Sequence, residues 1–107
     1  MSLTKKEFSK LLGHRKVILE KHLAQIHAEN ERELVNYVVE YYSDGSRKIG
    51  FVLYANDTVI AMRSENDSMF DAVVHALRDL GHYMKLRHPN FMDNDGWSYI
   101  LEGLNKW

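Results

Sequence analysis

Three polar side chains in the C-terminal half of the chain have the spacing of a metal site. His75, Asp79 and His82 stand at i, i+4 and i+7, so on a helix all three project from one side. Imidazole and carboxylate groups at this spacing can hold zinc, with water or a fourth residue completing the site. Arg78 and Lys85 share that side, and their positive charge would oppose a bound cation. A solvated helix face therefore accounts for these residues better than a metal centre does.

A second set of residues has the chemistry of a calcium loop. Asp93, Asp95, Gly96 and Glu102 match positions three, five, six and twelve of an EF-hand loop. The first ligand position would fall on Phe91, whose side chain has no oxygen. An aspartate–glycine turn that begins a last helix explains the same residues. We therefore expect no metal and no cofactor.

The motifs of the common enzyme classes are absent from the sequence. It contains no glycine-rich phosphate loop, no nucleophile elbow and no HExxH pattern. It also has no cysteine, which excludes disulfides, thiolate metal sites and cysteine nucleophiles. No pair of side chains stands out as a general acid and base. The sequence predicts a binding protein, not an enzyme, with no catalytic residue.

Charge is distributed unevenly along the chain. The 107 residues carry a net charge of −1, but residues 1–28 carry +4 and residues 29–71 carry −5. A basic end can contact polyanions, and an acidic middle can contact proteins that bind polyanions. The candidate nucleic-acid-binding residues are Lys6, Lys10, Arg15, Lys16 and Lys21. The candidate protein-binding residues are Glu29, Glu31, Glu33, Glu65, Asp67 and Asp71.

The N-terminal quarter has a helical pattern. Thr4-Lys5-Lys6-Glu7 has the form of a capping box, and apolar residues then recur on one side of a helical wheel: Phe8, Leu11, Leu12, Ile18, Leu19 and Ile26. Arg15 falls inside this stripe, and Gly13 allows a break that would re-phase the second half. We expect helix over about 4–27, either interrupted near Gly13 or divided into two short helices.

The middle of the chain alternates between apolar and polar residues with the period of strands. Strands are predicted at about 35–42, 47–55 and 58–63, with a turn at Ser43-Asp44-Gly45-Ser46 and another at Asn56-Asp57. Phe51 is expected to face the core. A helix over about 68–87 follows, begins at Asp67 or Ser68, and is stopped by Pro89. The prediction is an α+β fold of αβββα(α) order, in which a three-stranded antiparallel meander has its helices packed on one face.

The C-terminal segment is rich in aromatic residues. Trp97 opens a predicted short third helix. With Tyr99 and Trp107 it has the composition of a protein contact, which suggests a homodimer, but covering one end of the sheet or the first helix is the favoured role of these residues. No composition shift or linker divides the chain, so residues 1–107 are expected to form a single domain. The sequence has no apolar signal core and no run long enough to span a membrane. We expect a cytoplasmic protein.

Residues 36–84 resemble the latter part of the ribosome hibernation factor family. The likeness rests on a strand pair, an acidic turn and the segment Asp67-Ser68-Met69-Phe70-Asp71-Ala72-Val73 before a long helix. The αβββα order also resembles a double-stranded RNA-binding domain, with Ser68 and Ala72 kept and the family's two phosphate-gripping lysines replaced by Met69 and Phe70. The layout with an acidic Ser64–Asp67 stretch is similar to that of small phage inhibitors of CRISPR nucleases. These resemblances imply RNA, a ribonucleoprotein or a nucleic-acid-binding protein as the partner.

Two binding functions follow from these patterns, and an enzyme whose catalytic groups come together only in the fold is the less favoured third alternative. The first is a small regulatory protein that contacts RNA or a ribonucleoprotein through a basic N-terminal helix. The second is an inhibitor of the kind encoded by phages or mobile elements, which docks on a nucleic-acid-binding protein through the acidic strand–helix region.

Overall fold

The computed structural model describes residues 3–27 and 34–105. In this part of the chain the elements follow in the order α1 (Lys5–Leu12), β1 (Lys16–His27), β2 (Leu34–Ser43), β3 (Ile49–Ala55), β4 (Thr58–Asn66), α2 (Met69–Arg87), α3 (Pro89–Asp93) and α4 (Gly96–Asn105).

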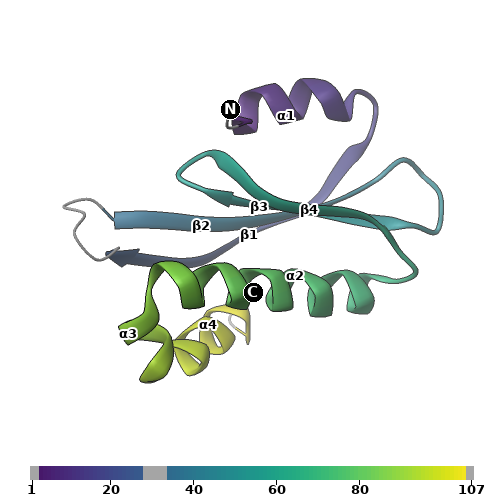
Figure 1. Ribbon diagram of the computed structural model, residues 1–107. Helices are drawn as coiled ribbons and strands as arrows, with labels where there is room; N and C mark the ends of the chain where they lie inside the picture. The colour runs from purple at the N-terminus through teal and green to yellow at the C-terminus, as the bar shows by residue number, and fades with distance from the viewer. Residues whose placement is uncertain (1–2, 28–33, 106–107) are drawn as a thin grey trace.

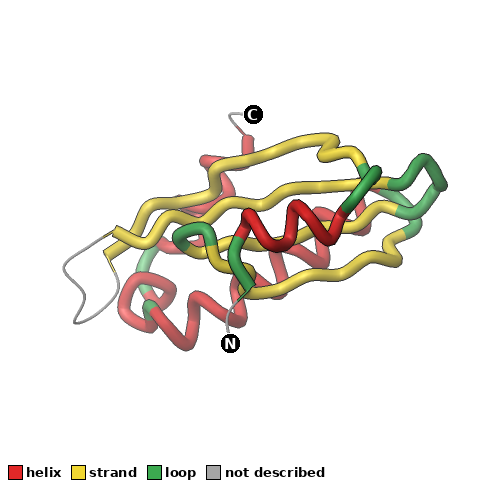
Figure 2. The backbone as a smooth tube through the Cα atoms, turned by 90° about the horizontal axis from the view of Figure 1, so that it is seen from above, coloured by secondary structure: helices red, strands yellow, loops and turns green. Residues whose placement is uncertain are grey.

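The strands form one antiparallel sheet in the order β1-β2-β3-β4, so each strand pairs with its neighbours in sequence. Helix α1 lies on one face of the sheet, and α2, α3 and α4 lie on the other (Figure 1). Figure 2 looks onto the α1 side and shows this helix running roughly along the strands. The sheet is therefore covered on both faces.

The larger core lies between the sheet and α2. Tyr37 and Tyr41 of β2, Phe51 of β3, and Leu80 and Met84 of α2 are almost completely buried in it. Phe51 thus faces the core, as predicted. Ser68 begins α2, because its side-chain oxygen accepts a hydrogen bond of 3.1 Å from the backbone N–H of Asp71.

The smaller core lies beneath α1. Phe8 and Leu12 point down from the helix onto Tyr42, Val52 and Tyr54, which project from the opposite side of the same strands. Strands β2 and β3 therefore contribute side chains to both cores. This explains why their central residues are buried almost without interruption.

The start of α1 is fixed to the β3–β4 turn. The predicted capping box is present, since Glu7 N–H donates to Thr4 Oγ1 over 3.1 Å and the Glu7 carboxylate accepts from the Thr4 backbone. Just before the helix, Val59 N–H donates to the Leu3 carbonyl over 2.7 Å. The chain entering α1 is thereby held against the start of β4.

The prediction of helix over 4–27 is wrong beyond Leu12. Gly13 has a φ of 62° and ends the helix, and β1 begins at Lys16. Register shifts between Val17 and Leu19 and between His22 and Ala24 mark irregularities in the β1–β2 pairing. Such bulges re-phase the side chains along a strand. The two-residue alternation of β1 is interrupted, and its apolar spacing therefore resembles that of a helix.

The predicted three-stranded sheet with helices on one face is wrong in the same region. The additional strand β1 makes the sheet four-stranded, and α1 lies across from the other helices. The predicted antiparallel meander, the α+β class and the helix at 68–87 are confirmed. The short helix expected near Trp97 is present as α4, and α3 was not predicted.

Within the described residues, every helix is too short or too polar to cross a membrane.

Candidate functional site

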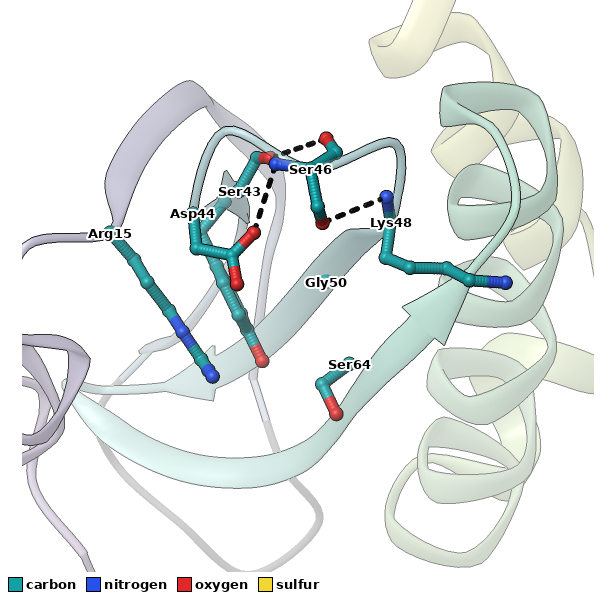
Figure 3. Close-up of a pocket in the computed structure, with 8 residues that line it drawn as sticks. Arg15, Ser43, Asp44, Ser46, Lys48, Gly50 and Ser64 are labelled. Carbon is teal, nitrogen blue, oxygen red and sulfur yellow. Dashed lines mark hydrogen bonds between the residues drawn. The ribbon is translucent and has the colours of Figure 1, made fainter.

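Two neighbouring hollows open on the α1 side of the sheet. The smaller holds about 40 Å³, lies at the β2–β3 turn and is lined by Arg15, Tyr42, Ser43, Asp44, Ser46, Lys48, Gly50 and Ser64 (Figure 3). The larger holds about 330 Å³, lies between α1 and β4 and is lined by Phe8, Leu11, Leu12, Arg15, Tyr42, Met62, Arg63 and Ser64. Because Arg15, Tyr42 and Ser64 line both, we treat the two as one site, the Arg15 groove.

Tyr42 forms part of the wall of this groove and is held from two sides. Its register partner on β3 is Gly50, and a Cβ atom at that position would lie only 2.3 Å from Tyr42 Cζ. Phe8 meets the Tyr42 ring edge-on, with the ring centroids 6.0 Å apart. The Arg15 guanidinium carbon lies 5.8 Å from the Tyr42 centroid. Burial raises the pKa of Tyr42, against the opposing charge of Arg15.

The β2–β3 turn that borders the smaller hollow is held by its own polar groups. Ser46 N–H donates to Asp44 Oδ1 over 3.0 Å, and Lys48 N–H donates to Ser46 Oγ over 3.2 Å (Figure 3). Gly45 supplies the positive φ of 97° that the turn requires. The hydrogen bonds from Ser46, and then the charge of Arg15, lower the pKa of Asp44. Asp44 is therefore an acid within the groove and partly balances its positive charge.

The cations of the groove differ in their partners. Lys48 forms an ion pair with Asp67, which raises the pKa of the lysine. Within the described part of the chain, neither Arg15 nor Arg63 forms an ion pair. The larger hollow is lined by both arginines and by no acidic residue. This half of the groove suits an anion.

The predicted basic residues do not share a single helix face. Lys6 and Lys10 are exposed on α1, and Arg15 lies in the link that follows. Lys16 and the half-buried Lys21 belong to β1. Of this set, Arg15 alone lines the groove. The groove's second arginine, Arg63, was missed because it lies on a strand far away in sequence.

The predicted acidic residues are only partly placed. Glu29, Glu31 and Glu33 lie outside the described residues. The other three follow one another along the chain. Glu65 lies at the end of β4, Asp67 lies in the link to α2, and Asp71 lies in the first turn of α2. Lys48 neutralises part of this acidic segment through its ion pair with Asp67.

A second polar cluster, missed by the sequence reasoning, lies beside α1. Lys5 Nζ donates to Glu20 Oε2 over 2.7 Å. Glu20 on β1 is the register partner of Glu40 on the neighbouring strand β2. Glu40 is only 5% exposed, and its Oε1 and the Tyr54 hydroxyl have no hydrogen-bond partner among the described residues. Burial, and then the Glu40 carboxylate, raise the pKa of Tyr54. The hydrogen bond from Lys5 lowers the pKa of Glu20. These residues do not line the Arg15 groove, and the Lys5–Glu20 ion pair ties α1 to β1.

The two sets of residues with metal-ligand spacing in the sequence do not have the arrangement of a metal site in the described structure. His75 turns toward Asn66, with Nδ1 2.6 Å from Oδ1, while His82 is exposed. Asp93 and Asp95 are exposed before α4, and Glu102 is exposed on that helix. Among the described side chains, no group of three or more histidine and acidic residues is placed to hold a metal ion.

The C-terminal aromatic residues divide between packing and exposure. The Trp97 ring lies on Gly81, where a Cβ atom would come within 2.2 Å of it. Tyr99 packs edge-on against Phe91, with their centroids 5.8 Å apart, and is otherwise half exposed. Trp107 lies outside the described residues.

Comparison with models of protein families, with curated proteins and with solved structures found no match to this chain.

Proposed function

We propose that this is a non-enzymatic binding protein that holds a segment of RNA in the Arg15 groove. One observation carries the proposal: two arginines without ion-pair partners in the described chain line a hollow that contains no acidic residue. The guanidinium group offers a rigid fork of donors that matches phosphate oxygens and is always charged.

The smaller hollow supports a phosphate contact. Arg15 is joined there by the hydroxyl groups of Ser46 and Ser64, which can donate to phosphate oxygens, whereas the Ser43 hydroxyl already donates to the Ser46 carbonyl. A volume of about 40 Å³ has room for roughly three waters, which is comparable with one phosphate group. Asp44 limits this contact, so the principal site is the larger hollow.

The larger hollow supports a contact with the nucleotide between phosphates. Leu11 and Met62 line it and are 73% and 47% exposed, so they offer apolar surface to a base or sugar. Tyr42, although aromatic, is buried and offers no face for stacking. Binding is therefore expected to depend on the backbone and only weakly on base sequence.

The length of the groove sets the size of the contact. Helix α1 has eight residues and is about 12 Å long, which limits contact to two or three phosphates. For single strands, each neutralised phosphate contributes about −0.7 to the slope of log affinity against log salt concentration. We expect a slope between about −1.4 and −2.1.

The test is binding of a labelled single-stranded RNA over a range of salt concentrations. Arg15→Gln and Arg63→Gln should each weaken binding and reduce the slope by about 0.7. Lys85→Gln removes the same charge from α2, on the other side of the sheet, and should change neither. Equal effects of all three substitutions, or no binding at any salt concentration, would contradict the proposal.

The runner-up is a protein inhibitor that docks through its acidic segment. The observation in its favour is the succession of Glu65, Asp67 and Asp71 between β4 and α2. Failure of RNA binding, together with capture of a nucleic-acid-binding protein that is lost on Glu65→Lys, would support this function instead.

A further inference from the structure

Helix α2 carries apolar side chains that no other described element covers. Phe70 is 74% exposed and Val74, one turn later, is 46% exposed. The line they begin continues along the helix through the half-buried Leu77 to Gly81, where Trp97 of α4 covers it. Phe70 and Val74 are thus neighbours in one exposed apolar strip, and contiguous apolar surface, unlike single exposed residues, marks interaction sites.

Charges on the same side of α2 change sign along the helix. Asp71 lies in the first turn and Arg78 lies two turns further on. At 100° per residue, Asp71, Val74 and Arg78 fall within an arc of about 60°. Ala72, Ala76 and Leu80 face the opposite way, into the core. The outward side of α2 is therefore acidic at its start, apolar at its centre and basic beyond.

This order of charges along α2 is complementary to that of a second α2 that runs antiparallel to it. A two-fold axis between Val74 and His75 places Asp71 opposite Arg78 of a second copy, and Arg78 opposite Asp71 of that copy. The Val74 side chains then meet near the axis, and Phe70 lies beside Arg78 of the second copy. Both ion pairs form through one isologous contact.

We propose that two copies of this chain associate through α2, packed antiparallel about an axis between Val74 and His75. Trp97 and Leu101 of α4, which are 39% and 46% exposed, lie on the second helix of the same side and extend the apolar area. The Arg15 groove lies across the sheet and stays open in both copies. The proposal is therefore independent of RNA binding.

The test is the oligomeric state, measured by analytical ultracentrifugation over a range of concentrations. The natural chain should form a dimer. Asp71→Arg or Arg78→Asp alone places like charges opposite each other twice and should raise the dissociation constant more than about tenfold. Combining both changes in one chain restores opposite charges and should restore the dimer.

A mixing experiment separates pairing from folding. The Asp71→Arg chain carries two cations at these positions and the Arg78→Asp chain carries two acids, so equimolar mixing should produce a heterodimer. Phe70→Ser should weaken the dimer, whereas Leu86→Ser, which also removes an exposed apolar side chain from α2, should not. A monomer at every concentration, a dimer that survives both single reversals, or no heterodimer on mixing would overturn the proposal.

Discussion

Tyr42 depends on the absence of a side chain at Gly50. The ring lies so close to the Gly50 backbone that a methyl group there would overlap Cζ, Cε2 and the hydroxyl oxygen. The ring cannot shift freely, because Phe8 packs against it on the α1 side. Any larger residue at position 50 must therefore displace Tyr42 and reshape the Arg15 groove.

We predict that Gly50→Ala lowers the free energy of unfolding by about 1–3 kcal/mol through overpacking. It should also weaken RNA binding, because Tyr42 lines both hollows of the groove. Chemical denaturation of Gly50→Ala, Tyr42→Ala and the double variant measures the coupling. The loss in the double variant should be smaller than the sum of the two single losses, and strict additivity would show that the contact is unimportant.

The candidate site shows what sequence could and could not reveal about single residues. Tyr42 directly precedes the predicted Ser43–Ser46 turn, whereas Gly50 lies four residues beyond it. A register drawn symmetrically about that turn would pair Tyr42 with Arg47, so the observed Tyr42–Gly50 pairing could not be predicted from the turn. The positive charge of Arg15 and its misfit in the apolar stripe both indicate its exposed position from the sequence. Arg63 in the groove and Glu40 in the cluster beside α1 had no such signal, because their neighbours come from other strands and from α1.

At the scale of elements, alternation in β2 and β3 together with the Asn56-Asp57 turn before β4 made these three strands predictable, although the β3–β4 pairing also has register shifts. The strand β1 was hidden by the loss of alternation along it. In β1 the buried residues Leu23 and Ala24 lie at the register shift between His22 and Ala24, and the two-residue alternation is lost there. A helical stripe accommodates adjacent apolar residues, so the helical interpretation fitted better. The side of the sheet on which α1 lies could not be predicted either, since both faces of β2 and β3 are apolar.

Phe8 is one of the two buried side chains of α1, and we predict that Phe8→Ala lowers the free energy of unfolding by about 3–5 kcal/mol. The side chain is buried against Tyr42 and Tyr54, with ring centroids 6.0 and 6.4 Å away. Leu11→Ala on the same helix is the matched control, and it should change stability by less than about 0.5 kcal/mol. Urea denaturation compares the two, and equal losses would show that the buried face of α1 was wrongly assigned.

At the scale of the whole molecule, buried tyrosines link stability to alkaline pH. Burial raises the pKa of Tyr41 from 10.0 to about 12. The folded state therefore keeps this proton more tightly than the unfolded state does. The resulting stabilisation is fully present below about pH 10 and is lost as the pH rises to about 12.

We predict that the chain loses up to about 3 kcal/mol of stability across this interval from Tyr41 alone. Tyrosinate absorbance and circular dichroism, followed together during an alkaline titration, measure the effect. The tyrosinate absorbance of the buried tyrosines should appear only at the pH at which the circular dichroism signal of the sheet is lost. Ionisation of all six tyrosines at the ordinary pKa in an intact fold would contradict the prediction.

The placement of the two cores on opposite faces of the sheet has a consequence for synthesis on the ribosome. The smaller core draws its buried residues from Phe8 to Tyr54, so all of them leave the exit tunnel before α2 does. The larger core needs Met84, Met92 and Ile100, which emerge last. Between the emergence of Tyr54 and that of α2, α1 can cover one face of the nascent sheet. The other face, lined by Tyr37, Tyr41 and Phe51, is then uncovered. The vulnerable species during biosynthesis is therefore a half-covered sheet, and its exposed face is the one that α2 later buries.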